Sequence, residues 1–484
     1  MFLVLISIFI PLLIGITMFF LKGIDRKVLN LLTIGTSISS LIFSIILCFM
    51  NNLSLSLFSI TNTLTAYLKV DGLSNFFSVI ISFIWIIVSI FAYKYLTIEE
   101  HENKFHTFYL LSLSMLLQLC YSGNLITMYI SFEMATLVSM PLVMHSKTKE
   151  SIQGATKYLY YSIGGAFLCL LGLFFITYYS LPGSEFILGG NLDLSKVGTN
   201  NIGFQIVILI MLIGFGAKAG MFPLHGWLPT AHPVAPSPAS AVLSGIITKA
   251  GVLAIIRLVF FSIGIDYIKS TWVQYVWVSI ILFTILLGSM MSLIQKNLKK
   301  RLAYSSISQL SYVLLGIAMM NEDSLAGSLL HIASHAIIKV GLFLTAGAII
   351  YYTGKHDIDE LEGIGKKLPI TMICFTILSL GLIGIPPTGG FVSKWYLATG
   401  SISSGLNILN IISPIVLLVS AILTAFYLLP ISIKGFFIGE NKEKLDKIKE
   451  SPLTFIPLII LASTIIIIGI FATPIVSIAK EIFF

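Results

Sequence analysis

Long hydrophobic segments alternate with short polar segments along the whole chain. Apolar stretches of about 20 residues, the length of a helix that crosses a bilayer, recur from Met1 to Phe484. Charged residues or Gly- and Pro-rich pieces separate these stretches. The pattern predicts about fourteen transmembrane helices. They begin near Phe2, Lys27, Leu73, His106, Leu125, Ser151, Phe204, Ala239, Trp272, Leu302, Leu325, Pro369, Leu406 and Leu453.

Two of the predicted helices are interrupted by prolines. The seventh is broken around Pro223 and Pro229, and the twelfth around Pro386 and Pro387. Broken helices at corresponding positions of two halves are typical of transporters with inverted repeats. We therefore expect an all-α polytopic membrane protein with about 14 transmembrane helices and two inverted five-helix repeats. The expected parts are helices one to three in 1–105, a first repeat (helices four to eight) in 106–262, a second repeat (helices nine to thirteen) in 271–434, and a linker with helix fourteen in 435–484.

The composition supports this class and excludes others. Of the 484 residues, 57% are hydrophobic and only 10% are charged, which argues against a soluble core. The net charge of +8 does not indicate nucleic-acid binding, because the basic residues lie in short loops between apolar spans. The four cysteines are isolated and lack the spacing of a metal, haem or disulfide framework. We therefore expect no cofactor, no metal and no redox chemistry in this chain.

The loop charges predict how the chain sits in the membrane. Five basic residues follow even-numbered spans or lie in the C-terminal tail: Lys69, Lys196, Arg257, Lys269 and Lys480. Twenty follow odd-numbered spans: Lys22, Arg26, Lys27, Lys94, Lys104, Lys147, Lys149, Lys157, Lys296, Lys299, Lys300, Arg301, Lys355, Lys366, Lys367, Lys434, Lys442, Lys444, Lys447 and Lys449. Because cytoplasmic loops carry the excess of Lys and Arg, both termini are predicted to lie outside the cell membrane.

Five charged residues fall inside predicted spans: Glu133, Lys218, Lys249, Lys339 and Lys394. A charge at the centre of a bilayer costs about 2.5 to 3.5 kcal/mol on insertion scales. A single lysine can snorkel or form a structural ion pair. Five such groups together indicate a path for protons or sodium ions.

Glu133 and Lys218 form the first candidate constellation. If the bundle brings the two residues together, the carboxylate stabilises the charged lysine while desolvation opposes it. The lysine then holds its proton when the acid is close and releases it when the acid moves away. The pair is a candidate switch.

His331, His335 and Lys339 form the second constellation. Their spacing by four places them on one face of the eleventh helix. Because histidine can accept and donate protons near neutral pH, we expect this stripe to act as a proton relay. His225 and His232 flank prolines near the end of the seventh span, where a loop-stabilising role is as good an explanation as a proton-carrying one.

Several motifs resemble one known family. They include FGAKAGMFPLHGWLPTAHPVAPSPASAVLSGIITKAGVLAIIR, LAYSSISQLSY at Leu302, HIASHAIIKVGLFL at His331 and GIPPTGGFVSKWY at Gly384. They are similar to motifs of the antiporter-like membrane subunits of respiratory complex I, membrane-bound hydrogenases and multisubunit Na+/H+ antiporters, and the similarity extends across most of the chain. The resemblance implies fourteen helices in two inverted five-helix repeats.

The resemblance also implies a role for each candidate residue. Glu133 and Lys218 would be the ion pair of the fifth and seventh spans. Lys249 would be the bridging lysine, and Lys394 the terminal lysine near the exit. His331, His335 and Lys339 would line the hydrophilic axis that connects them.

We therefore expect a proton-translocating subunit of a larger energy-converting complex, with sodium as the alternative ion. The complex would be a membrane-bound hydrogenase, a complex I-like NADH-quinone oxidoreductase or a multisubunit Na+/H+ antiporter. The expected partners are other membrane subunits, including sister antiporter-like subunits, and lipid. The alternative from another class is a stand-alone secondary transporter of a small solute.

Overall fold

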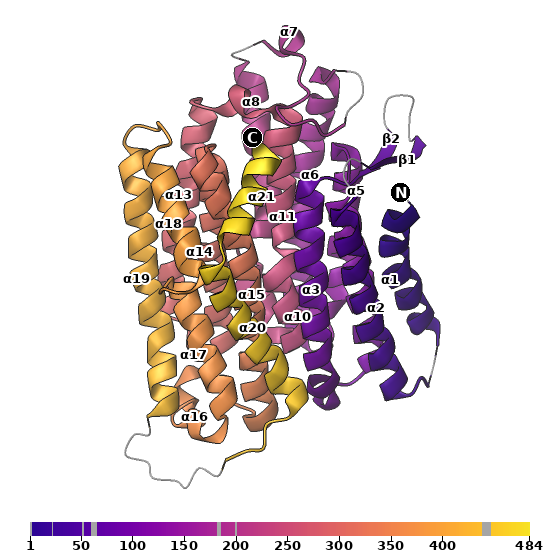
Figure 1. Cartoon of the computed structure of the whole chain (residues 1–484), viewed down its shortest axis with the longest axis vertical. Coiled ribbons are helices and arrows are strands. Elements are labelled where there is room, and N and C mark those ends of the chain that lie inside the picture. Colours follow the sequence, from indigo (N-terminus) through magenta and orange to yellow (C-terminus); the bar gives the residue numbers. More distant parts are fainter. Residues whose placement is uncertain are drawn as a thin grey trace.

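The computed structural model describes residues 2–21, 23–50, 53–59, 65–181, 185–198, 201–437 and 447–484. Its long helices run side by side in one bundle (Figure 1). The longer helices of the first half are α1 (Phe2–Phe20), α2 (Arg26–Cys48), α3 (Gly72–Tyr95), α4 (Glu102–Cys120), α5 (Leu125–Val143), α6 (Lys149–Tyr179) and α8 (Ile202–Ala219). Those of the second half are α13 (Trp272–Leu293), α14 (Leu298–Met319), α15 (Glu322–Thr353), α17 (Pro369–Ile383), α18 (Gly389–Ile402), α19 (Leu409–Phe436) and α20 (Pro452–Ile470).

The eighth span is a composite helix. It consists of α10 (Ser237–Val242), the π-helical η2 (Leu243–Ile247), α11 (Lys249–Ile256) and the π-helical η3 (Arg257–Ile263). π-helical turns are rare in proteins, and those that occur often lie at functional sites. One of them ends at Ile247, two residues before Lys249, and the other begins at Arg257.

The predicted number of spans is confirmed. Twelve segments of the described chain are long and apolar enough to cross a membrane. The more polar α4 adds one span, and the half-helices α17 and α18 together add the fourteenth. The chain is therefore a multi-pass membrane protein.

Both predicted helix breaks are confirmed. Helix α8 ends at Ala219 because Gly220 adopts a left-handed conformation with φ of 79°. The indole N–H of Trp227 then donates to the carbonyl of Ala217 at 2.9 Å, satisfying one of the free carbonyls at this helix end. Helix α17 ends in the same way at Gly384, with φ of 94°. Short helix α9 (Leu228–Val234) follows the first break, and α18 follows the second.

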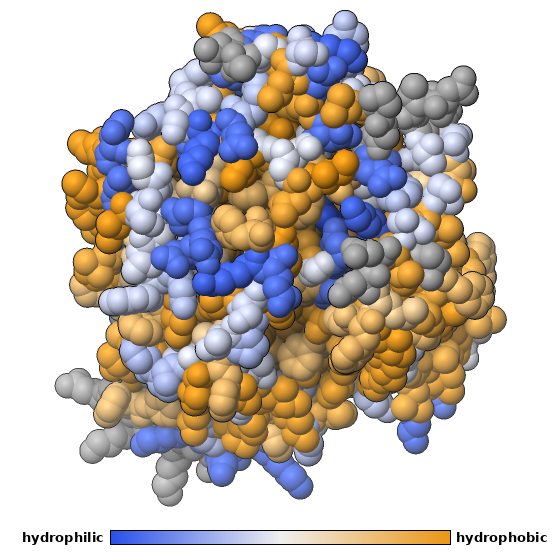
Figure 2. Space-filling model, turned by 45° about the horizontal axis from the view of Figure 1, so that its top comes forward, coloured by the Kyte–Doolittle hydropathy of each residue, from blue (hydrophilic) through white to orange (hydrophobic). Residues whose placement is uncertain are grey.

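The two ends of the bundle differ. One end, called here the hairpin end, carries short helix α7 (Leu194–Val197) and an antiparallel pair of strands, β1 (Ser54–Ser59) and β2 (Thr65–Lys69). The opposite end carries α16 (Ile364–Lys367) and is called the basic end, because Lys296, Lys366, Lys367 and Lys434 lie there. Figure 2 shows polar side chains gathered over the hairpin end and hydrophobic side chains on the flanks below it.

Three features of the fold were not predicted. The strands β1 and β2 were missed, although residues 53–57 (LSLSL) alternate between apolar and polar side chains, a pattern that favours a strand. The segment after the thirteenth span contains two helices, α20 and α21 (Thr473–Phe483), where one was expected. The remaining short helices, also unpredicted, are η1 (Leu96–Ile98), α12 (Ile265–Ile268) and η4 (Ile358–Glu360).

Two of the basic residues assigned to loops are in fact buried within helical spans. Arg257 is 2% exposed and belongs to the eighth span, and Lys299 is 5% exposed in the first turn of α14. The hydropathy pattern assigns a charged residue to a loop even where a partner in the folded protein stabilises its burial. Here Arg257 is paired with Asp71 at 2.6 Å, and Lys299 donates to the carbonyl of Ala235 at 2.8 Å. Three of the lysines assigned to the basic loops, Lys22, Lys442 and Lys444, lie outside the described residues.

The centre of the bundle is formed by α15 and the eighth span. The apolar window of each is completely buried by its neighbours. Helix α15 packs against α3, α10, α14, α17, α18 and α20. The two most enclosed spans of the molecule are therefore those that carry Lys249, His331, His335 and Lys339.

Candidate ion-translocation site

Lys249 and His335 meet at the centre of the bundle. The Nζ atom of Lys249, on α11, lies 2.7 Å from Nδ1 of His335, on α15. The same amine donates to the carbonyl of Ser244 at 2.8 Å. That carbonyl lies within the π-helical η2, where the backbone is distorted. A buried lysine thus touches a buried histidine with no intervening group, which is the geometry that direct proton transfer requires.

The histidine pair extends this contact toward the twelfth span. The rings of His331 and His335 are stacked with their centroids 6.0 Å apart and an interplanar angle of 24°. Nδ1 of His331 lies 2.8 Å from Oγ of Ser393, on α18. Nε2 of each histidine is buried without a hydrogen-bond partner. In each ring, Nδ1 therefore contacts a polar neighbour, and Nε2 is free to take part in a proton transfer.

Lys394 follows Ser393 and fills the second helix break. Its Nζ atom donates to the carbonyls of Leu382 and Ile383, at 2.7 and 2.8 Å. These are the last carbonyls of the half-helix α17, whose dipole favours a positive charge at this end. The break therefore creates the binding place for the amine that the sequence puts beside it.

Lys339 faces the other side of the central pair. Its amine donates to the carbonyl of Leu302 at 2.9 Å and makes a short contact with the hydroxyl of Ser305, both on α14. The next residue, Ser306, shares a hydrogen bond of 2.7 Å with Ser244, whose carbonyl accepts from Lys249. The three residues of the predicted stripe are all buried on α15, but Lys339 connects to Lys249 through serines of neighbouring spans and does not bond to His335.

Lys218 and Glu133 are neighbours without forming an ion pair. Lys218 lies at the end of α8, is completely buried, and donates to the carbonyl of Phe132 at 3.0 Å and to Oγ1 of Thr136 at 2.5 Å. Its amine also lies 4.2 Å from the centroid of the Phe132 ring. Glu133 is half-buried, and its Oε1 has no hydrogen-bond partner. In the described state, the lysine is held by the backbone around the acid rather than by the acid itself.

A glycine brings the first break close to the eighth span. A side chain at Gly251 would lie 2.5 Å from the carbonyl of Phe215 and 3.2 Å from Cβ of Lys218. Only a glycine permits this approach of α11 to α8. Lys218 therefore packs against α11. Lys249 lies on this same helix, two residues before Gly251.

The secondary histidines are not part of this chain of contacts. His232 is completely buried and stacks on Phe343 with a centroid distance of 4.8 Å, and both of its ring nitrogens lack partners. His225 is half-buried beside Phe222, with a centroid distance of 5.8 Å. His232 belongs to α9 and contacts α15 at Phe343, which lies one turn beyond Lys339. His225 lies farther out, next to the broken end of α8.

Most of the hydroxyl groups in the site could not be chosen from the sequence. Ser244, Ser305, Ser306, Ser393 and Thr136 look like the many other small polar residues of the spans. Only Ser393 has a local signal, because it directly precedes Lys394.

Lys299 was also missed as a buried group. Its position in the run Lys299, Lys300 and Arg301 made it look like a loop residue. Glu99, in the connection after α3, lies near it: burial raises the pKa of the Glu99 carboxyl, and the positive charge of Lys299 partly lowers it.

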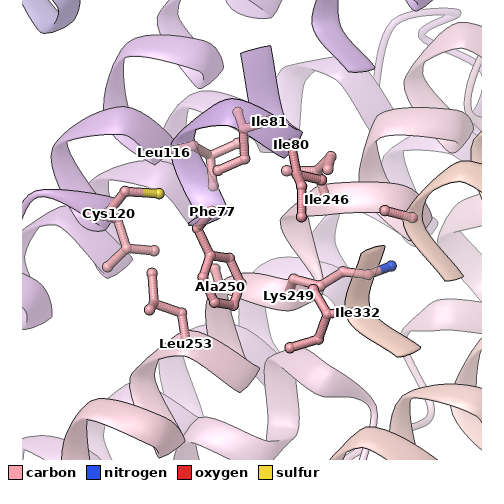
Figure 3. A pocket seen from close by; sticks show the side chains of 12 residues that line it. Phe77, Ile80, Ile81, Leu116, Cys120, Ile246, Lys249, Ala250, Leu253 and Ile332 are labelled. Atoms are coloured by element: carbon pink, nitrogen blue, oxygen red, sulfur yellow. The ribbon is translucent and has the colours of Figure 1, made fainter. Parts of the chain in front are cut away.

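A small cavity of about 10 Å³ lies beside Lys249. Its walls include Phe77, Cys120, Leu253 and the aliphatic part of Lys249 (Figure 3). Figure 3 shows the nitrogen of Lys249 pointing away from Cys120 and Leu253. A cavity of this size holds about one water molecule. The amine is therefore directed into the polar chain of α15, and only its apolar stem faces the cavity.

Comparison with known proteins defines the family. The model of the family described as "NADH:quinone oxidoreductase/Mrp antiporter, TM" matches residues 122–424, which contain all of the site residues predicted from the sequence. The chain belongs to this family of antiporter-like membrane proteins. The match confirms the resemblance inferred from the motifs.

Individual relatives come from several kinds of complex. The chain is 31% identical over 428 residues to an NADH-quinone oxidoreductase subunit of Desulforudis audaxviator, covering 85% of this chain and 83% of that protein. It is 28% identical over 410 residues to a Na(+)/H(+) antiporter subunit of Alkalihalophilus pseudofirmus, covering 84% and 81%. It is 32% identical over 354 residues to hydrogenase-4 component B of Escherichia coli, covering 68% and 50%.

Solved structures confirm the fold. A chain of the archaeal membrane-bound sulfane sulfur reductase superposes with a TM-score of 0.85 at 21% identity, covering 99% of this chain and 96% of that chain. A chain of the Mrp complex from Dietzia sp. DQ12-45-1b superposes with a TM-score of 0.83 at 18% identity, covering 99% and 97%.

Proposed function

We propose that this chain translocates protons across the membrane as one subunit of a larger energy-converting complex. The observation that carries the proposal is the contact of Lys249 with His335 at 2.7 Å, at the centre of a line of buried titratable residues that reaches Lys394. The line passes through the stacked histidines and Ser393, so that each group has a neighbour with which it can exchange a proton.

The chemistry of the line favours protons over sodium ions. Its groups are amines, imidazoles and hydroxyls, whereas hard cations prefer several oxygen ligands. A protonated lysine also repels a second cation. The only carboxylate of the set, Glu133, lies at the far end, beside Lys218.

The Glu133 and Lys218 pair supplies the proposed switch. The described state has the amine bound to the Phe132 carbonyl and to Thr136, and this corresponds to the separated form of the pair. A small rotation of α5 against the end of α8 would bring the Glu133 carboxylate to the amine. The approach would stabilise the protonated lysine, and the separation would favour release of its proton toward Lys249.

The proposed orientation places the basic end in the cytoplasm and both termini outside. The basic residues of the described loops support it, because they gather at the end of the bundle that carries α16. The two broken spans support the proposal that 106–262 and 271–434 are inverted repeats, since each repeat then contributes one broken helix with one buried lysine beside the break.

A stand-alone transporter of an organic solute has less support. The cavity that contacts Lys249 has a volume of about 10 Å³, whereas sites for small organic ligands have roughly 300 to 1,000 Å³. A larger crevice of about 720 Å³ beside α3 is lined by none of the buried titratable residues of the line. The relatives named above are subunits of NADH-quinone oxidoreductase, hydrogenase and Na+/H+ antiporter systems. We propose that this chain, like them, works with partner subunits that supply the driving force and any redox chemistry.

The test is ion transport by the intact complex. The complex containing this chain is purified in mild detergent, its iron, nickel and flavin are measured to identify the energy source, and it is reconstituted into vesicles. We expect energised proton movement to be lost in Lys249→Met and retained in Lys196→Met, which changes an exposed lysine of α7. Wild-type proton movement by assembled Lys249→Met complex would overturn the proposal, and coupled uptake of radiolabelled sodium would identify sodium as the ion.

A further inference from the structure

A second buried basic group lies on the eighth span, outside the line of titratable residues. Arg257, the first residue of η3, makes two hydrogen bonds to Asp71: Nη1 to Oδ2 at 2.6 Å and Nη2 to Oδ1 at 2.8 Å. Its guanidinium also lies between two aromatic rings, 5.1 Å from the centroid of Phe186 and 4.8 Å from that of Phe261. Because a buried arginine in a membrane protein is costly, its presence calls for a function.

The partner Asp71 is held rigidly. It caps the N-terminus of α3, accepting from the backbone N–H of Ser74 at 2.9 Å, while the Ser74 hydroxyl accepts from the Asp71 N–H at 2.8 Å. Burial alone would raise the pKa of Asp71, but Arg257, the Ser74 backbone and Lys69 together lower it. The carboxylate is therefore ionised and fixed in place.

The backbone around Arg257 is covered as well. The connection between α6 and α7 donates three backbone hydrogen bonds to η3: from Ile187 to Phe261, from Gly189 to Phe260 and from Asn191 to Ser262, at 3.1, 2.9 and 3.0 Å. These bonds satisfy carbonyls that the π-helical turn leaves free. At its hairpin end, the eighth span is thus covered by this connection. The Asp71–Arg257 ion pair joins it to the start of α3.

The ion pair lies directly between the cavity at Lys249 and the hairpin end. Lys249 and Leu253 line the small cavity, and Arg257 is the next residue of that series, one further turn toward the hairpin end. On α3, Phe77 lines the same cavity, and Asp71 precedes it by about two turns toward the same end. The pair therefore lies between α3 and the eighth span, on the side of the cavity that faces the hairpin end.

A larger hollow lies along α3 and includes one partner of the pair. Asp71 lines a crevice of about 720 Å³ whose walls also include Asn75 and Glu481 and apolar residues of α3, α15 and α21. Ile80 lines both the crevice and the small cavity. The crevice, with two carboxylates in its wall, and the cavity at Lys249 therefore share α3 as a wall.

We propose that the Asp71–Arg257 ion pair seals the outer end of the proton path, preventing protons held at Lys249 from leaking out between α3 and the eighth span. The proposal rests on the proton path and the orientation proposed above. An arginine held in place in a membrane pore is a known barrier to protons and cations. Arginine suits this role because it does not lose its proton in proteins and so cannot act as a relay itself.

The test separates passive leak from energised pumping. The intact complex is reconstituted into vesicles that contain a pH-sensitive dye, and an imposed potassium gradient with valinomycin drives proton entry without any energy source for the complex. We expect Asp71→Asn to raise passive proton entry severalfold over the wild type, because Arg257 loses its charged partner and is no longer held. Arg257→Lys should raise it less, since the charge remains but the two-pronged geometry is lost.

A matched control breaks a different ion pair. Glu102→Gln removes the partner of Arg26 at the basic end, where the two side chains lie 3.0 Å apart. It should leave the vesicles as tight as the wild type. If Asp71→Asn reduces assembly, the passive leak of the Arg257→Lys complex is the deciding measurement. Wild-type proton permeability of an assembled variant complex would overturn the proposed seal. A failure of the proton path itself would appear separately, as normal energised pumping by Lys249→Met with an unchanged passive leak.

Discussion

The two helix breaks hold their lysines in different ways. Lys218 belongs to the half-helix that ends at the first break, and its amine reaches across to α5, where it binds the Phe132 carbonyl and Thr136. Lys394 follows the second break, and its amine turns back to the carbonyls of Leu382 and Ile383 within its own span. The state of Lys218 therefore depends on how two spans are placed, whereas that of Lys394 depends on the end of one half-helix.

This difference suggests a division of tasks. A lysine whose neighbours lie on another span, next to a carboxylate, can respond to a small movement between helices. A lysine held by helix-end carbonyls remains where it is, and its proton is controlled by the groups around it, here Tyr312 at 5.1 Å and, against the Tyr312 ring, His331. We propose that the first break sets the direction of transfer and the second provides the last holding place.

The largest effect is expected at the second break. Lys394→Arg keeps the charge and can still donate to both carbonyls, so the end of α17 remains capped, but arginine cannot release its proton. We expect proton translocation by the reconstituted complex to be nearly abolished, as in Lys394→Met. Lys196→Arg, at an exposed position, is the control. Normal pumping by assembled Lys394→Arg complex would show that this residue only anchors the helix, and would remove the second break from the path.

The next effect is expected at the first break. Glu133→Gln removes the charge that can stabilise protonated Lys218, so pumping should fall severely. Because the Glu133 Oε1 atom has no hydrogen-bond partner in the described state, the substitution breaks no bond there, and assembly should stay close to that of the wild type. Glu150→Gln, at an exposed position of α6, is the control. If the assembled Glu133→Gln complex pumped at the wild-type rate, the switch would have to be abandoned.

A smaller effect is expected at Thr136. Thr136→Val removes the hydroxyl that binds Lys218, and a hydrogen bond to a charged group is worth about 1.5 to 3 kcal/mol. The amine retains the Phe132 carbonyl, so we expect a pumping rate between those of the wild type and Glu133→Gln. Thr136→Ser, which keeps the hydroxyl, should pump normally. Equal rates for the valine and serine variants would show that this contact does not position Lys218.

No effect on activity is expected from the variants that test orientation. Lys296→Cys, at the basic end, and Lys196→Cys, at the hairpin end, change exposed residues. In intact cells, with the half-buried Cys48 replaced by serine, an impermeant maleimide should label only Lys196→Cys. Labelling of Lys296→Cys from outside would reverse the orientation, and with it the side to which each break is assigned.

Much of this architecture was predictable from the sequence. The beginnings of the spans, both breaks and the burial of Lys218, Lys249 and Lys339 follow from local patterns. The partners of these lysines do not. The amine of Lys394 binds backbone carbonyls, which every residue possesses, and Lys249 finds a histidine 86 positions away. The ion pair expected between Glu133 and Lys218 is absent from the described state because the backbone at Phe132 and the Thr136 hydroxyl take the amine.

Arg257 shows most clearly that the sequence does not reveal the partner of a buried charge. In the sequence it interrupts an apolar run and was assigned to a loop, and its partner Asp71 lies 186 positions away.

The sequence by itself determined that this chain crosses the membrane about fourteen times, where two of the spans break, and which titratable residues lie within them, because hydrophobicity and helix breaking are local properties. The tertiary structure alone decided which of these groups touch, which amines are held by carbonyls and which arginine closes the path. Those contacts join segments far apart in the chain, and they are selected by packing and by the need to satisfy every buried polar group.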